Sequence, residues 1–157
     1  MANQDTARAR TTDYRERLVP GPGLFLAVLL VVPAISLVLT PVNASIAVPT
    51  AVIVYLLCAV LLFALSPTVT VSGGVLEAGR ARIPVDQLGG IELLGAEALR
   101  HAIGPGLDAR CYLLVRGWIH RGVKIENIDH ADPAPFWIIT TRHPRRLADA
   151  IEAAREA

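Results

Sequence analysis

The sequence is poor in charged residues, in aromatic residues and in cysteine. Charged residues make up 18% of its 157 residues and aromatic residues 5%, and there are two cysteines. Because soluble domains usually carry about 25% charged residues, this chain is unusually apolar. The formal net charge of +1 excludes a strong general attraction to nucleic acid, so no such partner is expected. Cys58 and Cys111 are interpreted as small buried apolar residues and not as a disulfide framework.

Motifs for catalysis, phosphate binding and metal binding are also missing. There is no Gly-rich phosphate loop, no nucleophile elbow and no His-Glu-x-x-His sequence. The sequence therefore predicts no enzyme, no cofactor, no metal site and no catalytic residue. Two alternatives stay open: a catalytic group assembled in space, and a cation held by His130 with Asp129 and Asp132. The four histidines lack the paired spacing of zinc sites: His101, His120, His130 and His143.

Two long apolar stretches, residues 24–39 and 46–65, dominate what is present. Neither holds a charged residue, and with their edges they cover about 23–40 and 44–65. A helix needs roughly 20 apolar residues, within a range of about 17–25, to cross a bilayer. Only residues 41–45 separate the stretches, so the two helices must run antiparallel. The sequence predicts a transmembrane helical hairpin over 23–65, kinked at Pro33.

A signal peptide and a buried hairpin are the alternative interpretations of these stretches, and both are disfavoured. Residues 42–44 resemble the small-residue cleavage site of a signal peptide, but the apolar run before them exceeds the usual signal core of about 7–15 residues. A hairpin buried in a soluble protein would need covering layers that the remaining residues hardly supply. A channel or transporter is disfavoured because neither span contains an ionisable residue.

The distribution of cations predicts the orientation of the hairpin. Arg8, Arg10, Arg15 and Arg17 precede the first span, and the turn between the spans carries no charge. Cationic flanks remain preferentially on the cytoplasmic side of a membrane. The prediction is a multi-pass protein of the cell membrane with both termini in the cytoplasm. Residues 1–22 are expected to form a disordered tail and a juxtamembrane segment, with Tyr14 at the membrane interface.

After residue 65 the pattern changes to short strands. Seven runs alternate or are rich in β-branched and aromatic residues, and turn residues separate them. A helix of about 144–156 follows, with Leu147, Ala150, Ile151 and Ala154 on one face. Residues 66–157 are thus expected to form a small antiparallel, seven-stranded barrel covered by a C-terminal helix. The expected strands are 68–71, 75–78, 80–83, 90–94, 111–119 with a bulge at Gly117, 123–126 and 136–141.

This order of elements resembles the bacterial pleckstrin-homology-like domain, which often follows a pair of membrane helices. Four local signatures carry a narrower resemblance over residues 13–155, to a family of short actinobacterial membrane proteins known only as a domain of unknown function. The resemblance implies an architecture and a phylum but no reaction. Gly117 departs from the family pattern, which has proline there. The signatures are at residues 14–18, 74–84, 116–118 and 132–144.

The predicted binding surface centres on residues 129–146. Asp132 is expected to order a loop stiffened by two prolines, and Trp137 to anchor that loop. Arginines cluster where the last helix begins, and the positive end of a helix suits an anion such as a lipid phosphate. Core packing of the tryptophans and solvation of the arginines are the alternative. The candidate residues are Asp132, Trp137, Arg142, Arg145, Arg146, Arg116 and Trp118.

The sequence therefore predicts an integral membrane protein that presents a cytoplasmic binding or scaffold domain at the inner face of the membrane. The expected partners are the lipid bilayer and either anionic lipid headgroups or another membrane protein. An accessory subunit, whose partner carries out the chemistry of a membrane enzyme or transporter, is the alternative.

Overall fold

The computed structural model describes residues 12–156, and these divide into two compact units. The chain up to Leu18 together with the chain from Thr68 onward forms the β unit, and Val19–Pro67 forms the helical unit. The helical unit is therefore an insertion between the first and second strands of the β unit. Of the predicted disordered tail, residues 1–12, all but Thr12 lie outside the described residues, and Thr12 begins the first strand.

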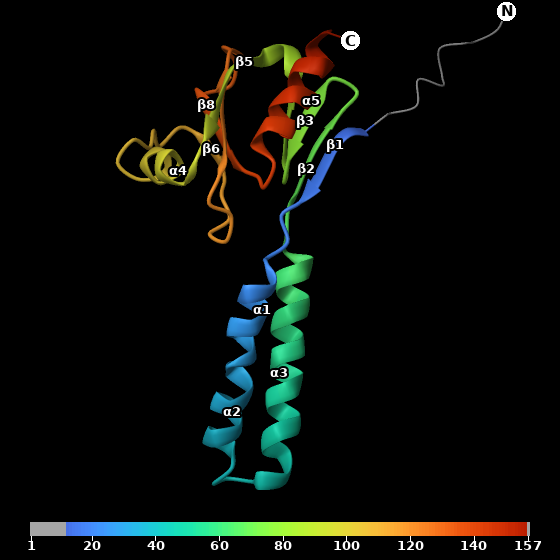
Figure 1. The fold of residues 1–157 in the computed structure, drawn as a ribbon, viewed down its shortest axis with the longest axis vertical. Helices are drawn as coiled ribbons and strands as arrows, with labels where there is room; N and C mark the ends of the chain where they lie inside the picture. Colours follow the sequence, from blue (N-terminus) through green and yellow to red (C-terminus); the bar gives the residue numbers. More distant parts are fainter. Residues whose placement is uncertain (1–11, 157) are drawn as a thin grey trace, which may run out of the picture. The chain divides into compact units, whose positions relative to one another are not determined.

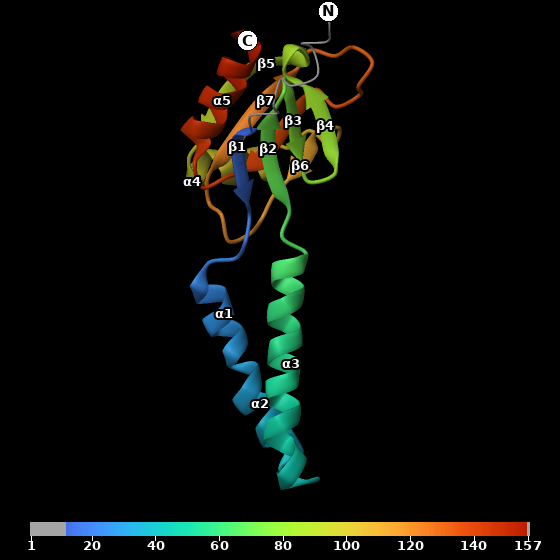
Figure 2. The same ribbon diagram turned by 90° about the vertical axis from the view of Figure 1, so that its right-hand side faces the viewer.

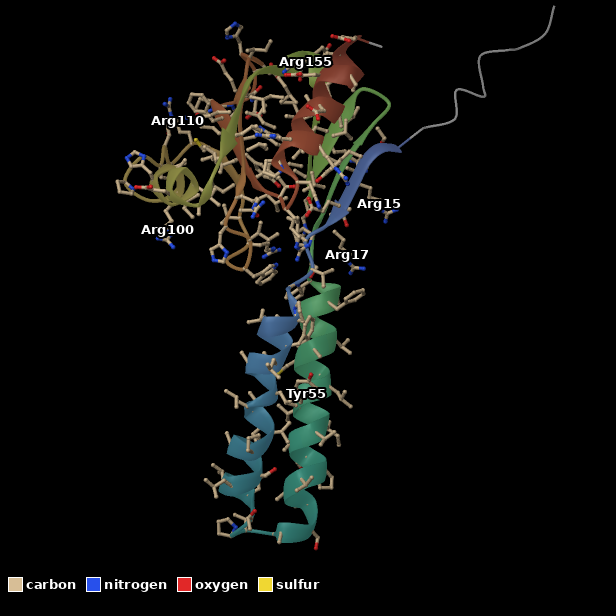
Figure 3. All side chains as sticks on the ribbon, in the orientation of Figure 1. Arg15, Arg17, Tyr55, Arg100, Arg110 and Arg155 are labelled. Atoms are coloured by element: carbon tan, nitrogen blue, oxygen red, sulfur yellow. The ribbon has the colours of Figure 1, made fainter. Side chains whose placement is uncertain are left out.

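The helical unit contains α1 (Pro22–Leu29), α2 (Val31–Leu39) and α3 (Ala44–Ala64), with α2 packed beside α3 (Figure 1). The break at Leu30 lies one turn before Pro33, whose ring excludes a hydrogen bond to the carbonyl of Leu29. The side chain of Asn43 caps α3 by accepting a hydrogen bond from the Ser45 N–H at 3.0 Å. The side chains of these helices are almost entirely carbon (Figure 3). Helices α1 and α2 together form one segment, Pro22–Leu39, and α3 forms a second, Ala44–Ala64. Each segment is long and apolar enough to cross a membrane.

The first sheet of the β unit is an antiparallel meander in the order β1-β2-β3-β4 (Figure 2). Its strands are β1 (Thr12–Arg17), β2 (Thr68–Ser72), β3 (Val75–Ala78) and β4 (Ala81–Pro84). Gly73 and Gly74 both have positive φ, as a two-residue hairpin turn requires. Strand β1 pairs antiparallel with β2, and the register places Arg17 opposite Thr68 although 50 residues separate them in the chain.

The second sheet has the order β5-β7-β8-β6 and mixes two kinds of pairing. Strand β7 pairs antiparallel with β5 and β8, whereas β6 and β8 are parallel. A short 3₁₀ helix, η1 (Val85–Gln87), leads into this sheet, and α4 (Ala96–Ile103) follows β5. The strands are β5 (Leu88–Leu94), β6 (Tyr112–Leu114), β7 (Gly122–Asn127) and β8 (Phe136–Thr140).

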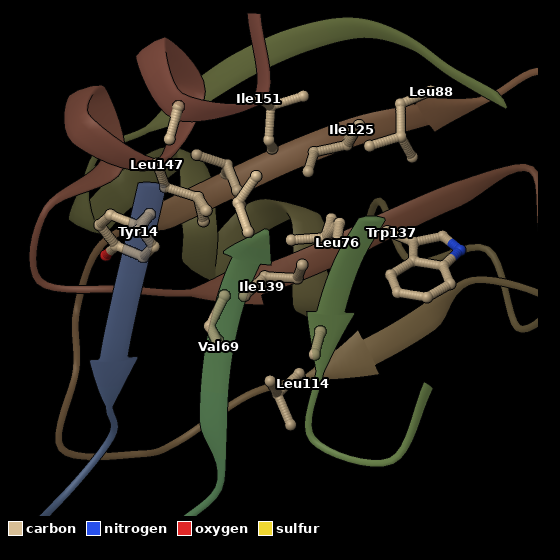
Figure 4. Packing of buried hydrophobic residues seen from close by; sticks show 14 of the residues in the cluster. Tyr14, Val69, Leu76, Leu88, Leu114, Ile125, Trp137, Ile139, Leu147 and Ile151 are labelled. Carbon is tan, nitrogen blue, oxygen red and sulfur yellow. The ribbon is translucent and has the colours of Figure 1, made fainter. Parts of the chain in front are cut away.

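Helix α5 (Pro144–Glu156) contacts β1, β2, β5 and β7, so it joins the two sheets (Figure 1). Leu147 and Ile151 are fully buried on its apolar face, and they meet Val69, Ile125 and Ile139 in one core (Figure 4). At its other end the Arg155 guanidinium donates to the carbonyls of Val85, Leu88 and Gly89. The predicted C-terminal helix is present, and it packs as its apolar stripe indicates.

The predicted closed, seven-stranded antiparallel barrel is wrong. The described residues form eight strands in two separate four-stranded sheets, and one of the strand pairs is parallel. All seven predicted strands are present, although the fifth, expected over 111–119, is only Tyr112–Leu114. The predicted bulge at Gly117 is therefore wrong, because residues 115–119 are not part of a strand. The eighth strand, β1, was missed because its residues are polar and its pairing partner lies beyond the inserted helices. Tyr14, expected at the membrane interface, is instead in the core of the β unit.

Candidate functional site

The turn between β8 and α5 positions the basic residues of the β unit. Thr141 is fully buried, and its hydroxyl oxygen accepts a hydrogen bond from the His143 N–H at 3.0 Å. Pro144 then begins α5, where its missing N–H costs nothing and its fixed φ suits the first helical residue. The helix start is thus held to the end of β8, and Arg145 and Arg146 project from its first turn.

The carboxylate of Glu16 ties this turn to strand β1. It accepts hydrogen bonds from the Tyr14 hydroxyl at 2.6 Å, from the Arg142 N–H at 3.0 Å and from the Thr141 hydroxyl. The Arg142 guanidinium lies 3.8 Å away as an ion-pair partner. Since the Glu16 side chain is only 9% exposed, these contacts form in a poorly hydrated place where charge-assisted hydrogen bonds are strong. We call this group, Tyr14, Glu16, Thr141 and Arg142, the Glu16 clasp.

Burial raises the pKa of Tyr14 well above its ordinary value, and the hydrogen bond that it donates to Glu16 raises it further. Ionisation of the phenol would place a second negative charge beside the carboxylate and remove the donor of that bond. Tyr14 therefore remains a neutral donor throughout the physiological pH range.

A groove of about 680 Å³ lies beside the clasp. Three segments line it: the end of β5 with the residues that follow it, the pair His120–Arg121, and the turn into α5. Its cationic or titratable side chains all belong to exposed residues, and no carboxylate is among the lining residues. We call this the basic groove; it is lined by Leu93, Leu94, Gly95, Ala96, His120, Arg121, His143, Pro144, Arg145 and Arg146.

The loop before His120 packs at the point where the chain leaves the β unit. The indole N–H of Trp118 donates to the carbonyl of Leu18, the last residue of that unit before the helices, at 3.3 Å. The Arg116 guanidinium lies 5.9 Å from the Trp118 ring, within cation–π range. A second cleft, of about 310 Å³, runs from Trp118 to Arg142 along His120 and Arg121. The rim of the basic groove is therefore continuous with the exit point of the chain.

Five of the predicted site residues lie in this region of the β unit. Arg145 and Arg146 line the basic groove, and Arg142 belongs to both the clasp and the second cleft. Trp118 lines the second cleft and has the Arg116 guanidinium within cation–π range of its ring. The structure places the other two, Asp132 and Trp137, away from these clefts.

Asp132 and Trp137 have structural surroundings. The Asp132 carboxylate accepts from the Asn127 amide and from the Ala134 N–H, both at 2.9 Å, which orders the loop between β7 and β8. Trp137 is 3% exposed and packs against Tyr112 with ring centroids 4.4 Å apart, inside the core (Figure 4). Neither residue lines a described cleft.

Sequence reasoning missed the residues that complete the site. His120 and Arg121 come from a loop more than twenty residues before α5, and Leu93 comes from strand β5. The adjacent basic pair was the only local signal for the loop. Glu16 and Tyr14 belong to the signature at 14–18, but no local pattern indicates that they contact Thr141. Among the described residues, no three His, Cys, Asp or Glu side chains lie close enough to hold a metal ion.

Neither curated proteins nor solved structures include a match to this chain. A family model described as a protein of unknown function, DUF3093, matches residues 13–151, a range that includes all but the first residue of β1, both long helical segments and most of α5. The chain belongs to this family of proteins of unknown function, DUF3093.

Proposed function

We propose that the chain is an integral membrane protein whose helical unit crosses the bilayer as a hairpin and whose β unit is a binding or scaffold module on the cytoplasmic face. The two helical segments contain 18 and 21 residues, which suits a bilayer core of about 30 Å. No Asp, Glu, Lys, Arg or His occurs between Arg17 and Glu77. Such a long uncharged stretch favours the membrane as its surroundings.

The pairing of β1 with β2 is the observation that carries this proposal. Arg17 precedes the helices and Thr68 follows them, yet the two residues are opposite each other in one sheet. Neighbouring strands of a sheet must lie on the same side of a membrane. The chain between them therefore crosses an even number of times, which supports a hairpin over a single crossing.

The placement on the cytoplasmic side rests on charge. Arg15 and Arg17 lie close before the first helical segment, and Arg80 and Arg82 follow the second, whereas the turn at 40–43 is uncharged. Arginine close to the end of a span is retained on the cytoplasmic side. The β unit is then presented to cytoplasmic ligands and to the inner leaflet.

Thiol labelling of intact cells tests this topology. In a background with Cys58→Ala and Cys111→Ala, single cysteines are introduced as Asn43→Cys in the turn and Arg110→Cys in the β unit. We expect an impermeant maleimide to label the first variant from outside and the second only after lysis. Labelling of the second variant alone would reverse the orientation, and labelling of both only after lysis would contradict the hairpin.

An apolar hollow on the helical unit supports a second candidate, the accessory subunit. About 580 Å³ of space lies beside the break at Leu30, lined by Gly23, Leu26, Ala27, Leu29, Leu30 and Pro33. A side chain from a partner's membrane helix fits such a hollow, since membrane helices associate by close packing. Purification in a mild detergent separates the candidates. A single stoichiometric protein that is lost in Ala27→Trp favours the accessory subunit, and its absence favours the self-contained binding module.

A further inference from the structure

The basic groove collects positive charge from two segments that are distant in the chain. Arg121 lies between β6 and β7, whereas Arg145 and Arg146 lie in the first turn of α5. His120 and His143 add titratable nitrogen donors, and no carboxylate lines the groove. The nearest carboxylates, Glu16 and Asp149, line the adjoining cleft that shares His143 and Arg146 with the groove. Within the groove itself the like charges repel each other, and a bound anion relieves that repulsion. The charge of the groove therefore selects a negative ligand.

The remaining lining of the groove is apolar, which restricts the chemical class of the ligand further. Leu93 is 47% exposed, and Ala96 and Pro144 also line the groove. A bare inorganic anion would leave this apolar surface in contact with water. A molecule that joins a phosphate to an apolar portion covers both kinds of lining at once.

The covalent connections bring such molecules within reach. Four residues, 18–21, separate β1 from α1, and three residues, 65–67, separate α3 from β2. An extended chain spans about 3.5 Å per residue, so these connections reach at most roughly 14 Å. The loop that carries His120 and Arg121 is held to the first of them by the hydrogen bond from Trp118 to Leu18. If the helices span the bilayer, lipid headgroups are the most abundant phosphates near the groove.

We infer that the basic groove binds the headgroup of an anionic lipid of the same membrane, with the lipid phosphate at Arg121, Arg145 and Arg146 and its glycerol portion against Leu93 and Ala96. This assignment rests on the proposed membrane function and names the ligand class of the β unit. Trp118, beside the exit point, suits the headgroup region, where tryptophan is enriched. The short connections to the helices already keep the β unit close to the membrane. The bound lipid therefore acts mainly on the orientation of the β unit.

The test uses the full-length chain in lipid nanodiscs. Ala96→Cys, in the background without Cys58 and Cys111, carries a dye whose emission shifts to the blue when water leaves its surroundings. We expect a saturable blue shift as phosphatidylglycerol replaces phosphatidylcholine. Each arginine close to an anionic surface contributes about five-fold in affinity, so Arg121→Ala with Arg145→Ala and Arg146→Ala should weaken the response by about 100-fold.

Two matched variants control the test. The triple lysine variant of the same positions retains the charge and should keep most of the response. Arg110→Ala removes an exposed arginine that pairs locally with Asp108, and it should leave the response unchanged. A parent that shows no shift in phosphatidylglycerol, or a triple alanine variant that responds like the parent, overturns the inference.

Inorganic phosphate separates the lipid from a free anion. The same blue shift on adding phosphate to phosphatidylcholine discs would show a site for soluble anions and overturn the lipid assignment. Both faces of a nanodisc are accessible, so a wrong orientation does not affect this measurement. Failure of the lipid assignment and failure of the proposed topology, tested by thiol labelling in cells, are thus distinguishable.

Discussion

Glu16 joins two segments of the β unit that lie 125 residues apart in the chain. Its carboxylate accepts hydrogen bonds from Tyr14, Thr141 and Arg142 while almost fully buried. One residue therefore fixes both the pairing of β1 with the rest of the unit and the position of the turn that begins α5. The placement of Arg145 and Arg146 at the groove depends on this turn.

Glu16→Ala should lower the free energy of unfolding by about 2–4 kcal/mol, because it removes the buried carboxylate that accepts hydrogen bonds from Tyr14, Thr141 and the Arg142 N–H. Chemical denaturation of the purified chain in detergent measures the change. Glu77→Ala is the matched control, because that carboxylate pairs with an exposed arginine, Arg82, and its loss should cost less than about 1 kcal/mol. Equal effects of the two substitutions would show that the clasp does not stabilise the fold.

The raised pKa of Tyr14 predicts a loss of stability in alkaline solution. An unfolded tyrosine ionises near pH 10, whereas the folded Tyr14 stays protonated to higher pH. The stabilisation by its protonated form is complete below pH 10 and is lost as the pH rises from there toward the folded-state pKa. Melting temperatures between pH 8 and pH 11 should fall less steeply in Tyr14→Phe than in the parent. Unchanged steepness in the variant would assign the alkaline loss to other groups, among them Tyr112, whose pKa is also raised by burial.

Among the elements of the β unit, α5 is the helix that contacts strands of both sheets. Its apolar stripe packs on strands of both sheets, and Arg155 holds its last turn to the carbonyls at the start of β5. The helix thus adds contacts between two sheets that share no strand pairing among the described residues and that also meet directly in one core. It also carries one side of the basic groove.

Ile151→Asp should lower the stability of the β unit by about 4–5 kcal/mol, because it forces a charge without a partner into the core. Ala153→Asp, on the exposed face of the same helix, introduces the same side chain and should cost less than about 1 kcal/mol. Thermal unfolding followed by near-ultraviolet circular dichroism compares the two. If Ile151→Asp melts like Ala153→Asp, then α5 is not packed on the sheets in solution.

At the scale of the whole chain, the β unit is discontinuous and the helices are inserted into it. The segment 66–157, which the strand pattern suggests as a complete domain, lacks β1. Two buried residues of the core, Tyr14 and Leu18, are then missing, together with Glu16 of the clasp. The register of Arg17 with Thr68 means that the ends of the insertion are neighbours in space.

A chain in which a short Gly-Ser linker replaces residues 19–67 should therefore be soluble and unfold cooperatively, since the linker has only to bridge two adjacent strand ends. Residues 68–157 alone should be several kcal/mol less stable, because deletion of β1 uncovers β2 and removes large core side chains. Urea denaturation of the two proteins measures the difference. Equal midpoints and slopes would show that β1 is not an integral part of the fold.

Local patterns in the sequence were sufficient to predict the elements that are determined by neighbouring residues. An uncharged run of bilayer length predicts its helices, and a period of two interrupted by Gly73 and Gly74 predicts a hairpin of strands. The spacing of Leu147 and Ile151 predicts both α5 and the face that it buries. Of the candidate site, the arginines at the start of α5 were predictable, because they are neighbours in the sequence.

Tertiary structure alone decided the remaining features. Strand β1 has one apolar core residue within it, Tyr14, and it is a strand only because β2 supplies hydrogen-bond partners from beyond the inserted helices. The parallel pairing of β6 with β8 and the separation of the two sheets are likewise properties of pairing and not of composition. Arg121 and Leu93 reach the basic groove because separate strands end there. The hydrophobic period of an element indicates which of its faces is buried. The element that packs on that face is determined by contacts between residues that are distant in the chain.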